Sequence, residues 1–228
     1  MLTVHHLETS RSQRVLWLLE ELGTPYELKV YRRTAQRLAP PELKAVHPLG
    51  KSPVVTDDGR VVAESAVIIE YIAETYGANA GGDLAGLVPG RGSAEDWQCR
   101  YFMHYAEGSL MNWLVMKLVF STIPKQPMPF FAKPIARALC SKVEGQLIDP
   151  NLATAAQFLD AHLSANRWFA GSRITVADFQ MSFAVEALLS RGQALASMPH
   201  LVEYRDRINA RPAYQRALAK GGPVLIAS

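Results

Sequence analysis

Residues 47–69 constrain the fold of this 228-residue chain more than any other part of the sequence. Pro53 interrupts a strand, Asp58 and Gly59 turn the chain into a second strand, and Glu64 and Ser65 then open a helix. Exposed backbone beside a proline can pair with an extended peptide, and a helix N-terminus can hold its carboxylate. The stretch therefore predicts a hairpin and a helix that together form a peptide-binding corner.

The first third of the chain alternates strand and helix signals. Short strands are expected at residues 2–6, 26–31, 54–56 and 60–63, and helices at residues 12–22, just after Pro41, and at 65–76. Gly23 and Gly77 end the two longer helices. This order predicts a mixed sheet with helices packed on it.

Residues 78–92 are rich in glycine and other small residues and predict a linker between a domain at 1–77 and another at 93–228. The second domain has the pattern of helices throughout. Helices are expected at residues 93–120, 135–147, 151–164, 175–190, 199–210 and 212–219. Thr175 and Asp178, three residues apart at the head of an apolar helix, predict a capping box.

Four segments occur in the order and spacing found in the cytosolic glutathione transferases: residues 10–23, 50–55, 64–68 and 175–179. On these segments the chain resembles that family over nearly its whole length, and residues 104–109 resemble a bacterial and fungal subgroup. The resemblance implies an α/β thioredoxin-like N-terminal domain followed by an all-α helical bundle. It also implies a homodimer in which the domains of opposite subunits complete each site.

The chemistry that the resemblance implies is attack of the glutathione thiolate on a small hydrophobic electrophile, with glutathione as co-substrate. Lowering the pKa of a thiol from about 8.5 by roughly 2 units takes about 3 kcal/mol. A hydroxyl that donates to the thiolate supplies roughly 1.5–3 kcal/mol, and a helix N-terminus roughly 0.3–1 kcal/mol. Ser10 is the candidate hydroxyl, with Ser12 and Thr9 as alternatives. No tyrosine precedes Tyr26 and no cysteine precedes Cys99, so the resemblance is to the serine-type members.

The resemblance also assigns roles in binding glutathione. A cis bond between Ser52 and Pro53 would expose the backbone of Ser52 to the cysteinyl backbone of the ligand. Glu64 would accept from the γ-glutamyl amine, and Ser65 with its N–H would bind the carboxylate at the helix N-terminus. Taken alone, Glu64 and Ser65 are better explained as residues that suit a first helical turn, and only the resemblance reverses that preference.

The other two parts of the predicted site have simpler alternatives. Lys51 is expected to pair with the glycyl carboxylate, and His47 is a weaker candidate for the same group; a surface lysine and a loop histidine are the alternatives. The electrophile is expected beside the long second-domain helix, against Tyr105, Met111, Leu114 and Met116. Core packing or a dimer contact explains any one of these four residues at least as well as contact with the electrophile.

Composition excludes several classes of function. The net charge of +3 is too small to argue for nucleic acid as a partner. Cys99 and Cys140 form no disulfide framework, which favours a reducing compartment. The sequence lacks a signal-peptide pattern, a membrane-length apolar run and metal-ligand spacing, so we expect a cytoplasmic protein with no membrane and no metal. A glutathione-dependent peroxidase or disulfide reductase on the same fold, or a non-catalytic protein-binding module, remain the alternative functions.

Overall fold

The structure, a computed structural model, describes residues 1–191 and 198–224. Its N-terminal part holds a four-stranded sheet in the order β2-β1-β3-β4. Strand β1 (Leu2–Leu7) pairs in parallel with β2 (Glu27–Tyr31) and antiparallel with β3 (Val54–Asp57). Strand β4 (Arg60–Ala63) completes a hairpin with β3. The mixed sheet predicted from the sequence is confirmed.

Three helices accompany this sheet: α1 (Gln13–Leu22), α2 (Glu42–Val46) and α3 (Ser65–Tyr76). Helix α1 connects the two parallel strands and is buried over most of its length, because it packs against α3 and against two later helices, α8 and α10. Gly23 ends α1 in the left-handed conformation, with φ of 64°, that glycine adopts at little cost.

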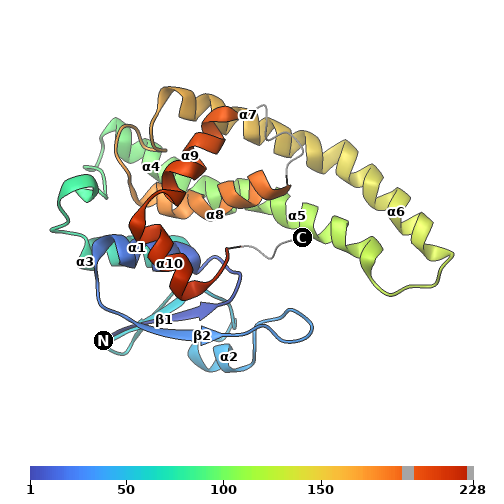
Figure 1. The fold of residues 1–228 in the computed structure, drawn as a ribbon, viewed down its shortest axis with the longest axis horizontal. Helices are drawn as coiled ribbons and strands as arrows, with labels where there is room; N and C mark the ends of the chain where they lie inside the picture. Colours follow the sequence, from blue (N-terminus) through green and yellow to red (C-terminus); the bar gives the residue numbers. More distant parts are fainter. Residues whose placement is uncertain (192–197, 225–228) are drawn as a thin grey trace.

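The rest of the described chain is helical (Figure 1). Its elements are η1 (Gly82–Leu84), α4 (Ala94–Tyr105), η2 (Ala106–Leu110), α5 (Met111–Thr122), η3 (Ile123–Lys125), α6 (Ala132–Val143), η4 (Glu144–Ile148), α7 (Asp149–Ala165), α8 (Val176–Arg191), α9 (Pro199–Asn209) and α10 (Pro212–Gly221). Figure 1 shows α5 and α6 forming an arm that projects beyond the sheet, while α10 returns to lie beside α1.

Two long helical runs differ from the prediction in their continuity. The helix expected at 93–120 is the run α4-η2-α5, in which η2 is a π-helical turn. The separate helices expected at 135–147 and 151–164 are one run, α6-η4-α7, so the predicted break is wrong. Helix η4 is also π-helical and ends at Ile148. Pro150 lies in the first turn of α7, where a residue that has no N–H to donate is tolerated.

One apolar core joins the two parts of the chain. The Trp17 ring on α1 lies 4.2 Å from the Phe179 ring on α8, centroid to centroid, and 5.4 Å from that of Tyr214 on α10. The glycine-rich stretch between the parts is anchored as well, because the carbonyl of Leu87 accepts a 3.0 Å hydrogen bond from the N–H of Val176. Helix α1 is therefore packed against the helical part through its side chains.

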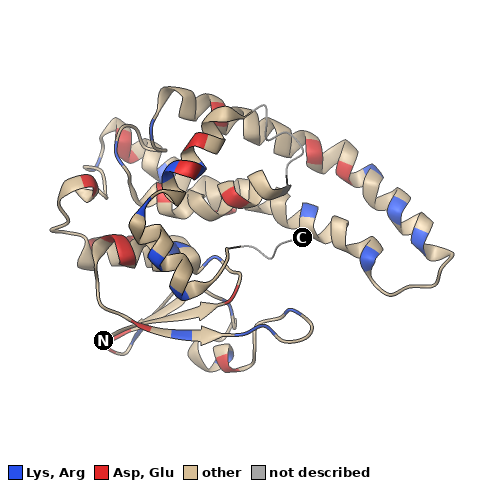
Figure 2. Ribbon diagram, viewed as in Figure 1, with Lys and Arg blue, Asp and Glu red and all other residues tan. Residues whose placement is uncertain are grey.

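Charge is unevenly distributed along the chain (Figure 2). Between Glu107 and Glu144, a stretch that includes most of the arm, the sequence has no acidic residue and has five basic ones: Lys117, Lys125, Lys133, Arg137 and Lys142. Within the part of the chain that the structure describes, no helix is both long and apolar enough to cross a membrane.

Candidate functional site

Three chain segments meet at one corner of the sheet. The strand register pairs His5 of β1 with Val54 of β3, and Val54 with Ala63 of β4. The end of β1, the start of β3 and the end of β4 therefore lie side by side. Consequently the loop before α1, the Ser52–Pro53 bond and the first turn of α3 lie close together.

The Ser52–Pro53 peptide bond is cis, as the resemblance implies. The Ser52 hydroxyl is tied to the neighbouring strand, since it donates to the carbonyl of His5 at 3.0 Å and accepts from the N–H of Leu7 at 3.1 Å. Among the described residues, the N–H and C=O of Ser52 itself have no backbone partner. These two main-chain groups are therefore available to an extended ligand.

The three hydroxyls considered near the start of α1 have different surroundings. Thr9, in a left-handed conformation with φ of 48°, is held by the Arg33 guanidinium at 3.3 Å. Ser12 occupies the N-cap position of α1 without a capping bond within the described chain, and its side chain is fully buried. Ser10 is 8% exposed, and its hydroxyl lies 2.7 Å from that of Ser12. Both serines are buried, and of the two only Ser10 keeps any exposed surface.

His6 lies on the buried side of these serines and was not among the residues predicted for the site. Its Nδ1 lies 2.7 Å from the Ser12 hydroxyl and its Nε2 lies 2.8 Å from the carbonyl of Gly221. Burial lowers the pKa of His6, opposed by its bond to Gly221. The sequence did contain a signal, because alternation along β1 places His6 on the same face as the apolar Leu2 and Val4.

The first turn of α3 is open to a ligand. Glu64 has φ of 71° and ψ of 124°, a conformation that costs of order 1–3 kcal/mol for a residue with a Cβ. Its exposed side chain makes no capping hydrogen bond within the described chain. The first N–H groups of a helix have no partner inside the helix. This helix end therefore presents free donors next to Ser65.

A buried arginine lies behind that turn. Nη1 of Arg14 donates to the Ser65 hydroxyl at 3.0 Å, to Glu107 Oε1 at 2.5 Å and to Gln180 Oε1 at 3.4 Å. Its Nε and Nη2 have no hydrogen-bond partner among the described residues. Burial lowers the pKa of Arg14 to about 10, against the opposing effect of Glu107, so the group stays charged at neutral pH. A positive charge therefore lies beside the N-terminus of α3, where it adds to the attraction for an anion.

Arg11 adds a second positive charge close to Arg14. Its Nε lies 3.1 Å from Glu107 Oε2, and both guanidinium groups lie near the ring of Phe183, at 6.0 and 5.4 Å from its centroid. Sequence reasoning did not assign either arginine a role. A signal existed for Arg14, because a charged residue directly before five apolar ones on a buried helix needs partners from elsewhere.

The structure shows the other predicted residues in less specific surroundings. Lys51 is exposed, and the ring of His47 accepts a long 3.4 Å bond from the N–H of Leu49. Met111 and Leu114 belong to the buried core, with 4% and 0% of their surfaces exposed. Tyr105 is half-buried.

Tyr105 stacks on Tyr101 and approaches Phe158 on α7, with ring centroids 5.6 and 5.8 Å away. Met116 is partly buried against the core. The structure therefore explains Tyr105, Met111, Leu114 and Met116 through packing.

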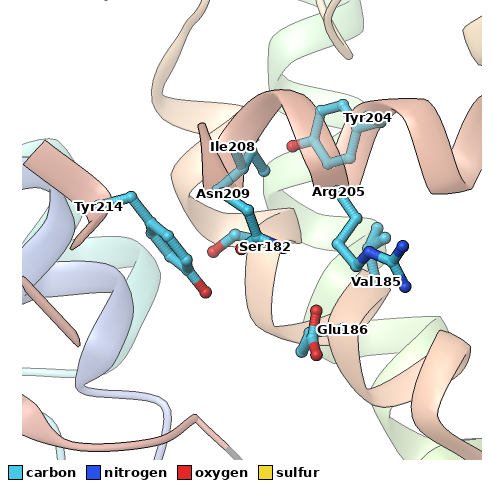
Figure 3. Close-up of a pocket in the computed structure, with 8 residues that line it drawn as sticks. All are labelled: Ser182, Val185, Glu186, Tyr204, Arg205, Ile208, Asn209 and Tyr214. Atoms are coloured by element: carbon cyan, nitrogen blue, oxygen red, sulfur yellow. The ribbon is translucent and has the colours of Figure 1, made fainter. Parts of the chain in front are cut away.

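A separate small pocket lies between α8, α9 and α10 (Figure 3). It is lined by Ser182, Val185, Glu186, Tyr204, Arg205, Ile208, Asn209 and Tyr214, none of which was a predicted site residue. Its volume of about 10 Å³ holds about one water molecule. This pocket is too small to bind a substrate.

Family models match both parts of the chain. The model described as "Glutathione S-transferase, N-terminal domain" matches residues 10–75, and "Glutathione S-transferase, C-terminal domain" matches residues 145–212. Among curated proteins, Glutathione S-transferase 3 of Schizosaccharomyces pombe is 34% identical and covers 96% of this chain and 88% of its own length. Glutathione S-transferase 1 of Saccharomyces cerevisiae is 28% identical, with coverage of 96% and 95%.

Solved structures agree with this. A glutathione S-transferase from Actinobacillus pleuropneumoniae is 29% identical, with a TM-score of 0.73 and coverage of 97% of this chain and 93% of its own. A sphingomonad glutathione S-transferase complexed with glutathione is 22% identical, with a TM-score of 0.70 and coverage of 97% and 99%. At that level of identity, the second structure supports the fold alone.

Proposed function

The chain belongs to the glutathione S-transferase family, and from this premise we propose that it holds glutathione at the corner of the sheet and uses Ser10 to keep the thiol ionised. The thiolate then attacks a small apolar electrophile. Conjugation to glutathione in general follows from the family; the residues, the ionisation and the electrophile class are what we propose.

The observation that carries the proposal is the open N-terminus of α3 with the Arg14 charge behind it. The γ-glutamyl carboxylate would accept from the N–H and hydroxyl of Ser65, and its amine would donate to Glu64. Ser52, whose backbone has no partner in the described chain, would pair with the cysteinyl unit. We assign the glycyl carboxylate to Lys51, which is exposed on the same loop.

Burial supports Ser10 as the hydroxyl that contacts sulfur. Ser12 is fully enclosed, and Thr9 is held by Arg33. A hydroxyl that donates to an anion contributes roughly 1.5–3 kcal/mol, and the nearby N-terminus of α1 adds roughly 0.3–1 kcal/mol. Together these approach the roughly 3 kcal/mol that lowers a thiol pKa by about 2 units.

The test is a pH titration of bound glutathione, followed through the ultraviolet absorbance of the thiolate, in the native protein and in Ser10→Ala. We expect the native protein to ionise the thiol well below its free pKa, and Ser10→Ala to bind glutathione without that shift. If the native protein binds glutathione without ionising the thiol, the binding site is supported but the proposed conjugation chemistry is excluded. Absence of binding would point to a non-catalytic role.

For the electrophile, we propose a surface beside α5. Met111 and Leu114 are enclosed in the core, whereas Val115, Leu118 and Val119 of the same helix are exposed apolar side chains. An apolar electrophile would bury them. Exchange of Leu118 for Ala should then change the ranking of electrophiles, whereas exchange of Leu114 for Ala should chiefly lower stability.

We propose that the protein acts as a homodimer. Trp97 is 64% exposed in the single chain, and Tyr101 and Val67 are about half exposed. Large apolar side chains on α3 and α4 are expected to be covered by a second copy. Sedimentation of the native protein and of Trp97→Glu tests this, because a dimer that uses this face should dissociate in the variant.

We also propose a cytoplasmic detoxifying role. Cys99 and Cys140 are free and buried, which suits a reducing compartment. Both thiols are enclosed, so neither competes with glutathione for the electrophile.

A further inference from the structure

A continuous row of hydrogen bonds leads from Ser10 into the interior of the protein. We call the row Ser10–Ser12–His6–Gly221 the hydrogen-bond chain. The Ser10 and Ser12 hydroxyls are 2.7 Å apart, Ser12 Oγ is 2.7 Å from His6 Nδ1, and His6 Nε2 is 2.8 Å from the Gly221 carbonyl. Each contact is at the length of a good hydrogen bond. The two serines and the histidine ring are buried.

The Gly221 end of the hydrogen-bond chain determines which group donates in each of its hydrogen bonds. A carbonyl oxygen only accepts, so Nε2 of His6 carries a hydrogen that it donates to Gly221. In the neutral ring Nδ1 is then an acceptor, and the Ser12 hydroxyl donates to it at 2.7 Å in preference to the Leu7 carbonyl at 3.5 Å. With its proton so used, the Ser12 oxygen accepts from Ser10. The hydroxyl of Ser10 therefore points inward. Its oxygen also accepts a 3.3 Å bond from the N–H of Ser12, which leaves one lone pair for a further donor.

A Ser10 hydroxyl that donates inward cannot donate to a thiolate, but its oxygen can accept a proton from a thiol. Resting on the proposed function of Ser10, we propose that His6 is the final acceptor of the glutathione thiol proton, which it receives through Ser12 and Ser10. His6 does not touch the sulfur and acts only through the two serines.

The transfer balances in atoms and charge. The S–H bond breaks, its electron pair stays on sulfur, and the proton goes to Ser10 Oγ. Ser10 passes its own proton to Ser12, and Ser12 passes its proton to Nδ1 of His6. Both serines stay neutral, the ring becomes an imidazolium, and both hydroxyls now point outward. Ser10 thereby becomes a donor to the thiolate that the same transfer created.

The surroundings of His6 suit both states of the ring. Burial lowers the pKa of His6, so the ring is neutral and ready to accept at pH 7 before the ligand binds. The imidazolium is favoured by the negative end of α10, whose last residue is Gly221, and by the field of Glu8. Once formed, the thiolate adds a further negative charge near the hydrogen-bond chain, which also favours the imidazolium.

Helix α10 packs closely against His6 and α1 at Gly221. A Cβ built on Gly221 would lie 2.5 Å from Leu16 Cδ1 and from Gln13 Oε1, and 3.0 Å from Cε1 of His6. A larger residue here would displace these side chains, so glycine suits the close approach of the carbonyl to the ring. Helix α10, which lies beside α1 in Figure 1, thus sets the proton direction at the N-terminal site through the bond between His6 and Gly221.

The test compares the protons released with the thiolate formed when glutathione binds at pH 7. Proton release is measured by calorimetry in buffers of different ionisation enthalpy, with S-methylglutathione, which has no thiol proton, as the background. In the native protein we expect thiolate to form with much less than one proton released for each. Equal amounts of thiolate and released proton in the native protein would overturn the proposal, and that measurement needs no variant.

Variants then locate the acceptor. Ser12→Ala and His6→Gln should each reduce thiolate at pH 7 by about tenfold or more, and the remaining thiolate should be matched by released protons. His5→Gln is the control, because His5 is the adjacent buried histidine but bonds Tyr31 and Thr56 instead. It should leave the proton balance unchanged. A His6 ring that stays neutral by nitrogen NMR in the glutathione complex would also contradict the proposal.

Failure of this proposal is distinct from failure of the proposed function. If Ser10→Ala removes the thiolate while Ser12→Ala and His6→Gln retain it, the serine mechanism stands and the hydrogen-bond chain has no role in it. If Ser10→Ala retains the thiolate, the role of Ser10 itself is refuted.

Discussion

Two helix N-termini in this protein begin with the same kinds of residue and have opposite uses. Helix α3 begins at Glu64 and Ser65, and α8 follows Thr175 with Asp178 in its first turn. At α8 the Asp178 carboxylate accepts from the N–H of Thr175 at 2.8 Å and from that of Phe169 at 2.9 Å. At α3 the side chain of Glu64 makes no capping bond within the described chain.

Backbone conformation and burial explain the difference. Asp178 is fully buried, and its carboxylate also accepts from the Tyr204 hydroxyl at 3.3 Å. The N–H of Val176, the first residue of α8, donates to the carbonyl of Leu87 at 3.0 Å, so this terminus finds partners within the protein. Glu64 is exposed and has a positive φ, and its side chain makes no capping bond within the described chain. The end that is filled stabilises the fold, and the end that is left open is available to a ligand.

The largest effect is expected from the filled terminus. Asp178→Ala would leave the N–H groups of Thr175 and Phe169 and the Tyr204 hydroxyl without their acceptor in a buried place. We expect a loss of about 3–5 kcal/mol in the free energy of unfolding, measured by urea denaturation at pH 7. Glutathione affinity of the folded protein should stay within about twofold; a large loss of affinity at unchanged stability would contradict the comparison.

The pH dependence of stability sharpens the same contrast. Burial raises the pKa of Asp178 to about 6, above its unfolded value near 4. Between these values the folded state binds more protons than the unfolded state, so the contribution of this group is fully present below pH 4 and is lost as pH rises through 6.

We expect the stability difference between the native protein and Asp178→Asn to fall by up to about 3 kcal/mol over that range. Urea denaturation of both proteins at several pH values measures it. A difference that grows with pH would show that hydrogen bonds to the carboxylate outweigh its burial.

The open terminus should respond in binding. Ser65→Ala removes a hydroxyl from the proposed carboxylate site and an acceptor from Arg14, and should weaken glutathione binding by about 10- to 100-fold in calorimetry. Thr175→Ala is its counterpart at the filled end. That variant should lower stability by about 1 kcal/mol and leave affinity unchanged. If the two variants exchanged these effects, the assignment of open and filled ends would be reversed.

The smallest effect is expected at Glu64, where one substitution should raise stability and lower glutathione affinity. Glu64→Gly relieves the strained backbone and should raise stability by about 0.5–1 kcal/mol while weakening glutathione binding. Arg37→Gly is the control, since Arg37 also has a positive φ, of 62°, but lies in a loop outside the site. It should gain stability without losing affinity. A stabilised Glu64→Gly that binds as well as the native protein would remove Glu64 from the site.

The fold was accessible from the sequence because local signals agreed with one another. Helical spacing and Gly23 defined α1, and the turn at Asp58 and Gly59 set the hairpin, with the strand ends predicted nearly correctly. The break expected near Pro150 is absent because a π-helical turn ends at Ile148 and Pro150 lies in the first turn of α7, where a missing N–H is tolerated.

For the candidate site, the sequence by itself determined which residue types stand at the ends of β1, β3 and β4, because short-range turn and cap chemistry places them there. Only the tertiary structure decided which of them have partners. Arg14 bonds Glu107 and Gln180, which are 93 and 166 residues away in the chain, and His6 bonds Gly221, 215 residues away. Such contacts form only when the helical part packs on the sheet, since burial forces each enclosed polar group to find a partner wherever the fold supplies one.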